Sequence, residues 1–239
     1  MGRSDPLACT DRTGWYNCHR PRTGIAGHTP ASRVTNLPEQ HTQVACVVIS
    51  AEATSYTFRF QEKDPFVTTL SEITALLGEP RFNWSDPAPW DGLERELGVE
   101  LPADFREITD AYGSIEINKQ LYLEHPAGHL LHSLGRSVRD DLAFWREEDM
   151  AEFLPSPVGA DQGELIPVAS ATTGEAVFLR VPDSPSALWR VVVQEFDSPA
   201  WTLYEMTFGE WLLAYLKGRD VTLCSRNLAP DGPFYTFLP

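Results

Sequence analysis

The sequence predicts an α+β fold with a mainly antiparallel central sheet flanked by helices, preceded by a flexible N-terminal arm. Two observations carry this prediction. From residue 67 onward, helical hydrophobic spacing occurs near both ends, and between these segments apolar residues alternate as they do in strands. With 42% hydrophobic residues, the chain of 239 residues has enough apolar content to fill a core.

The first 66 residues differ in composition from the rest. Prolines are scattered there without a sustained apolar period, which is typical of a largely disordered arm, and residues 44–60 carry a short hairpin pattern. Residues 1–66 hold 7 of the 19 basic and 6 of the 34 acidic residues, so they carry +1 and residues 67–239 carry -16. Two interpretations stay open: a true arm before a domain at 67–239, or a segment that is not translated in the natural protein, with synthesis starting at Val67.

Three helices are predicted before the sheet. The first, over residues 69–77, begins with capping-box spacing between Thr69 and Glu72. The other two, over residues 90–97 and 102–112, carry apolar residues at helical spacing and end at glycines. Because their connection is short, they form an αα-hairpin.

The spacing then changes to the alternation of strands. Strands are predicted at 115–117 and 121–123, followed by a helix over 134–145. Further strands are predicted at 165–168, 176–181, 188–193 and 201–206, with a hairpin turn at Thr172-Thr-Gly174 between the first two. The last helix begins with a capping box formed by Thr207 and Glu210 and ends before Gly218.

The acidic excess excludes several classes of partner. A formal charge of -15 repels phosphate backbones and anionic lipid, so we expect neither nucleic acid nor membrane as a partner, whereas a basic protein fits. The αα-hairpin carries acidic residues at 91, 94, 96, 100, 104, 107 and 110 against only Arg95 and Arg106, the reverse of a DNA-reading helix pair. The lack of a signal-peptide pattern and the 4 scattered cysteines predict a cytoplasmic protein.

No motif indicates catalysis. The sequence contains no G-x-S-x-G elbow, P-loop or G-x-G-x-x-G turn. His125, His129 and His132 lie close together, but Pro126 and Gly128 place them in a loop and no further ligand completes a zinc site, so we interpret them as surface histidines. We therefore expect no catalytic residue, metal or cofactor.

The αα-hairpin resembles the opening motif of the SUKH superfamily, of the Smi/Knr type. Members typically show an aromatic or aliphatic residue, Glu, Leu-Gly, and Leu-Pro followed by Asp-aromatic-Arg. The matching residues are Trp90, Glu94, Leu97, Gly98, Leu101, Pro102, Asp104, Phe105, Arg106, Tyr112 and Gly113. Residues 173–175 and the helix at 208–218 resemble later parts of the family, so the resemblance covers residues 69–218. The family has no shared active site, and we expect the motif residues to be structural.

The resemblance implies a non-enzymatic binding protein. Many bacterial members are immunity proteins that neutralise a toxin domain, often a nuclease, and an acidic face can occupy a basic nuclease cleft. The expected contact residues are the carboxylates of Glu96, Glu100, Asp104, Asp140, Asp141, Glu147, Glu148 and Asp149. Two alternatives remain: a regulatory scaffold of the Smi/Knr type, and a hydrolase with an acidic cleft.

Overall fold

The computed structural model describes residues 69–195, 198–223 and 228–239. The predicted arm, the hairpin at 44–60 and the alternative start at Val67 lie outside these residues. In chain order the elements are α2 (Thr69–Leu77), α3 (Ala88–Leu97), α4 (Ala103–Tyr112), β1 (Ile115–Ile117), β2 (Leu121–Leu123), α5 (Leu134–Trp145), α6 (Glu148–Ala151), β3 (Leu165–Ala171), β4 (Ala176–Arg180), β5 (Arg190–Gln194), β6 (Trp201–Tyr204), α7 (Phe208–Leu216) and β7 (Tyr235–Phe237).

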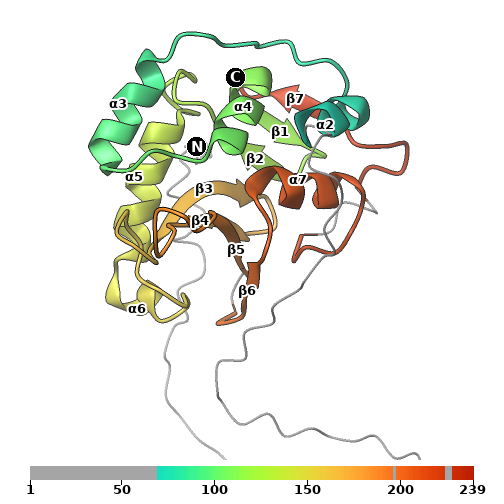
Figure 1. Cartoon of the computed structure of the whole chain (residues 1–239). Coiled ribbons are helices and arrows are strands. Elements are labelled where there is room, and N and C mark those ends of the chain that lie inside the picture. The colour runs from blue at the N-terminus through green and yellow to red at the C-terminus, as the bar shows by residue number, and fades with distance from the viewer. Residues whose placement is uncertain (1–68, 196–197, 224–227) are drawn as a thin grey trace, which may run out of the picture. The chain divides into compact units, whose positions relative to one another are not determined.

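The described strands form a seven-stranded sheet in the order β6-β5-β4-β3-β2-β1-β7, and every pairing is antiparallel (Figure 1). This confirms the predicted α+β class with a mainly antiparallel sheet. The hairpin turn predicted at 172–174 joins β3 to β4, and Gly174 adopts a φ of 100° there. Glycine suits this turn because it tolerates positive φ.

Two elements were not predicted from the sequence. The helix α6 is a single turn of four residues without a buried side chain, so it has no hydrophobic period to detect. The strand β7 pairs with β1 at the edge of the sheet. Next to this pairing, the Asn118 backbone N–H donates to the Phe234 carbonyl at 2.9 Å, and the Asn118 side-chain Oδ1 accepts from the Phe234 N–H at 3.0 Å. Such pairing depends on residues far apart in the chain, which local spacing does not reveal.

The helices α2, α4 and α7 pack against one another, and α3 lies next to α5 (Figure 1). In the first group, the rings of Phe105 and Phe208 meet edge to face at 4.8 Å. Thr207 and Glu210 form the predicted capping box at the start of α7. Thr69 is the first described helical residue of α2, and Glu72 pairs at 2.6 Å with Lys217, the residue that directly follows α7. The first helix is therefore tied to the last.

Within the described segments, no helix has both the length and the apolar character needed to cross a bilayer.

Candidate functional site

The residues of the αα-hairpin motif hold the hairpin together. The Glu94 carboxylate accepts hydrogen bonds from the Leu101 N–H at 3.0 Å and from Arg106 at 3.2 Å. The Arg106 guanidinium lies 5.5 Å from the ring centre of Trp90, within the range of a cation–π contact. Trp90, Leu101, Phe105 and Tyr112 are at most 2% exposed, which agrees with a structural role. Leu97 differs: it lies at the end of α3 and is only partly buried against the core.

The two glycines of the motif adopt different conformations. Gly98 has φ 80° and ψ 10°, the left-handed conformation that commonly ends a helix, and a Cβ there would meet open space. Gly113 has φ 75° and ψ -154°, a region open essentially to glycine alone. A Cβ at Gly113 would lie 2.7 Å from Cγ of Phe82. The chain therefore needs glycine at 113 for two independent reasons.

The expected contact carboxylates do not form one surface of equivalent groups. Asp104 accepts a hydrogen bond from the Gly209 N–H at 2.8 Å and thereby caps the start of α7. Glu96 pairs with Arg139 at 2.9 Å, linking α3 to α5, and Glu100 is within 3.4 Å of Arg106. These three groups therefore have intramolecular roles.

The carboxylates of α5 and α6 are more available. Asp140 is 61% exposed at its side chain and lies 3.4 Å from Arg136, whereas Asp141 is half-buried. Glu147, Glu148 and Asp149 are all exposed, and none forms an ion pair with another described residue. We call these three residues the α6 corner.

The three clustered histidines have different environments. His125 is 0% exposed, so its interpretation as a surface histidine is wrong. His132 lies with Nδ1 3.6 Å from a carboxylate oxygen of the buried Glu124, and His129 is exposed. Among the described residues, no group of three or more His, Cys, Asp or Glu side chains is arranged to hold a metal ion.

His125 is buried in an aromatic cluster. Its ring lies 5.0 Å from Phe82, 5.6 Å from Trp84 and 5.4 Å from Trp90, measured between ring centres. One sequence signal was available: His125 continues the alternation of the buried Leu121 and Leu123, which places it on the inward face of that strand's path.

Both ring nitrogens of His125 are engaged. The Ala127 N–H donates to Nδ1 at 3.0 Å, so the proton of the neutral ring lies on Nε2, which donates to Oδ1 of Asp110 at 2.7 Å. Burial lowers the pKa of His125 below its usual value, although the hydrogen bond and charge of Asp110 act in the opposite direction. The imidazole is therefore neutral at neutral pH, and His125 is a hydrogen-bond donor to Asp110 but not its counter-ion.

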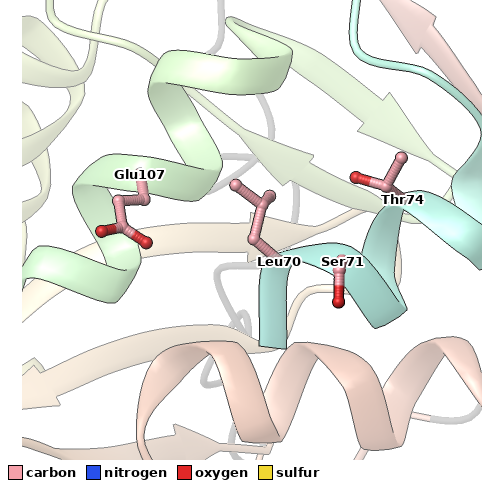
Figure 2. Close-up of a pocket in the computed structure, with 4 residues that line it drawn as sticks. All are labelled: Leu70, Ser71, Thr74 and Glu107. Carbon is pink, nitrogen blue, oxygen red and sulfur yellow. The ribbon is translucent and has the colours of Figure 1, made fainter. Parts of the chain in front are cut away.

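Asp110 also lines a surface groove along α4. Two depressions share Leu70 and Glu107. The first, of about 350 Å³, is lined by Leu70, Ser71, Thr74 and Glu107, with Leu70 and Glu107 on opposite sides (Figure 2). The second, of about 280 Å³, is lined by Leu70, Asn83, Trp84, Glu107, Asp110 and Ala111. We call the two together the α4 groove.

Backbone contacts fix one wall of the α4 groove. The Trp84 N–H donates to the Asp110 carbonyl at 2.7 Å, and the Asn83 N–H donates to the Ala111 carbonyl at 3.1 Å. These bonds satisfy carbonyls at the end of α4 that have no partner within the helix. They also hold Trp84 next to Asp110. No sequence pattern indicates this groove, because its walls come from three segments that meet only in the fold.

Comparisons with models of known protein families, with curated proteins and with solved structures find no match to this chain.

Proposed function

We propose that this chain is a non-enzymatic, SUKH-like binding protein that neutralises a toxin domain, of the nuclease kind in particular, by covering its basic cleft with an acidic surface. The observation that carries the proposal is the α6 corner, where three exposed carboxylates have no positive partner among the described residues. A basic protein is the partner that would neutralise them.

The charge distribution supports this proposal. Several arginines are paired within the chain, as Arg139 is with Glu96 and Arg180 with Asp183. The arginine next to the corner in the sequence, Arg146, is outnumbered by the corner's three carboxylates. The α6 corner is therefore a local excess within a chain of net charge -15. Complementary charge of this kind accelerates association and favours the correct partner more than it raises affinity.

The geometry around His125 leaves this histidine unavailable as the general base of a hydrolase. A histidine that acts as a general base must offer a ring nitrogen with a free lone pair to a substrate or water. In His125, Nδ1 already accepts from Ala127 and Nε2 already donates to Asp110. The most buried histidine of the described chain is thus committed to holding a loop.

The test is capture and inhibition of the partner. The full chain, carrying an affinity tag, is used to isolate its partner from the source organism, and the isolated protein is then assayed for toxic activity with and without the chain. We expect a basic toxin domain that the chain inhibits stoichiometrically, with binding that weakens as salt is added. A captured protein whose activity the chain leaves unchanged would favour the regulatory alternative.

A charge-matched pair of variants locates the binding surface. The first replaces Glu147, Glu148 and Asp149 by Lys; the second replaces the exposed Glu79, Glu195 and Asp231 by Lys. Each reversal adds two charges, so both variants move the net charge from -15 to -9. We expect only the first to slow association by about tenfold or more. Equal effects would mean that overall charge matters and that the α6 corner is not the contact surface.

A further inference from the structure

We propose that the α4 groove binds an arginine or lysine side chain presented by a basic protein partner. The inference deepens the proposed function and rests on it for the nature of the partner, but the groove itself has features that point to a cation. These features are two carboxylates without a counter-ion among the described residues, and walls that carry an aromatic and an aliphatic side chain.

Asp110 is a carboxylate without a counter-ion. Its Oδ1 accepts hydrogen bonds from Trp90 Nε1 and His125 Nε2, both at 2.7 Å, and both donors are neutral. Oδ2 receives no hydrogen bond from a described residue, and the side chain is only 30% exposed. A partly buried charge in this position costs free energy unless a cation or further donors stabilise it.

Glu107 adds a second charge to the same groove. It lies three residues before Asp110 on α4, so the two side chains share one face of the helix. Glu107 is exposed and makes no ion pair within the described chain. The nearest arginine along the helix, Arg106, is already bound to Glu94 and Glu100. Both carboxylates therefore line the same depression without a basic side chain of the described chain to neutralise them.

The walls suit the rest of a long cationic side chain. Trp84 lines the groove together with Asp110, and an indole ring attracts a guanidinium or ammonium group. The Trp84 ring stacks on Phe82 at 5.3 Å between ring centres, which holds it in place. Leu70, on the α2 side, offers an apolar surface for the methylene stem (Figure 2). The groove thus combines two carboxylates, an aromatic side chain and an aliphatic side chain.

The experiment uses the full chain and a small probe, so that it does not depend on knowing the partner. The amides of Nα-acetylarginine and Nα-acetyllysine, which keep their side-chain charge, are titrated against the chain. The amide of Nα-acetylcitrulline is the uncharged control of similar shape. Binding is followed by NMR at the Trp84 indole N–H and the Ser71 and Ala111 amides. We expect saturable shifts at these positions with the cationic probes and none with citrulline.

Variants assign the binding to the groove. Glu107→Gln removes one charge from an exposed position and is expected to lower the affinity for the arginine probe by about threefold to tenfold. Glu107→Lys should abolish binding of this probe. Glu195→Gln, at an exposed position outside both the α4 groove and the α6 corner, is the matched control and should leave the affinity unchanged. Asp110 is not substituted, because it also holds His125 and Trp90.

The outcomes separate this inference from the proposed function. The groove would be overturned as a cation site if citrulline bound as well as arginine, or if Glu107→Lys left the affinity for the arginine probe unchanged. The absence of NMR shifts at Trp84, Ser71 and Ala111 would also overturn it, because a groove filled by another segment of this chain would give that result. If the arginine probe binds as expected but the isolated partner is not an inhibited toxin, the groove stands and the proposed function fails. If the toxin is inhibited equally by wild type and Glu107→Lys, the groove is not part of that interface.

Discussion

The glycines of the αα-hairpin offer a graded test of how the backbone constrains this fold. Gly92 lies inside α3 with open space around it, Gly98 is left-handed with open space, and Gly113 combines a glycine-only conformation with close approach to Phe82. Replacing each by Ala adds the same methyl group. Any difference in the free energy of unfolding therefore reports the local conformation and the space available.

The structure sets the expected order. Gly92→Ala should stabilise the protein by about 0.5–1 kcal/mol, because Ala restricts the unfolded chain and suits a helix interior. Gly98→Ala should cost about 1 kcal/mol for a Cβ in the left-handed region. Gly113→Ala combines about 1–3 kcal/mol of backbone strain with about 1–3 kcal/mol of overpacking, since its Cβ would lie 2.7 Å from the Phe82 ring.

The assay is urea denaturation of the full chain, followed by tryptophan fluorescence and far-UV circular dichroism, with Phe82→Ala added singly and in combination. Phe82→Ala removes the close contact but leaves the backbone strain, so the double variant should lose less stability than the two single losses added together. The reasoning is refuted if Gly113→Ala costs no more than Gly98→Ala. If the losses of unfolding free energy from Gly113→Ala and Phe82→Ala simply add in the double variant, the close contact with Phe82 is excluded as a cause. The backbone strain at Gly113 would still stand.

Three further changes have defined outcomes. Phe105→Ala, at a 0% exposed position, should lower the free energy of unfolding by about 3–5 kcal/mol, and Leu97→Ala by markedly less because Leu97 is only partly buried; equal losses in urea denaturation would contradict the burial. Asp104→Ala removes the acceptor for the Gly209 N–H and should cost about 1 kcal/mol, measured as a shift in the urea midpoint without a change in m. The pKa of His125 is lowered in the folded state, so below its unfolded pKa of about 6.5 the unfolded chain binds more protons and stability falls as pH drops. The loss of stability between pH 7.5 and pH 5 should therefore be smaller in His125→Gln than in the wild type, and an equal loss would assign the acid sensitivity to other groups.

Much of the fold followed from local sequence patterns. The spacing of apolar residues predicted α3, α4, α5 and α7 and six of the strands, since a side chain that must be buried repeats every 3.6 residues in a helix and every second residue in a strand. The pattern was less informative at the ends of elements. Leu97 shares the apolar spacing of Leu93, but it lies where α3 ends and less of the fold covers it.

The surroundings of the candidate residues followed less from the sequence than the fold did. Asp104, which stays a predicted contact residue, also caps α7, 105 residues away, and no local pattern indicates that role. His125 was expected at the surface, although the alternation of Leu121 and Leu123 predicts an inward position for it. Its partner Asp110, 15 residues earlier, becomes a neighbour only when the strand packs beside α4.

The α+β class, the succession of helices and strands and the acidic charge of the chain follow from composition and from preferences that act over a few neighbouring residues. The roles of the carboxylates follow from the fold, which sets which of them are neutralised by arginines, which cap a helix and which remain available at the α6 corner and in the α4 groove. The energy of a charge depends on its distance from other charges and from water, and folding sets those distances between residues far apart in the chain.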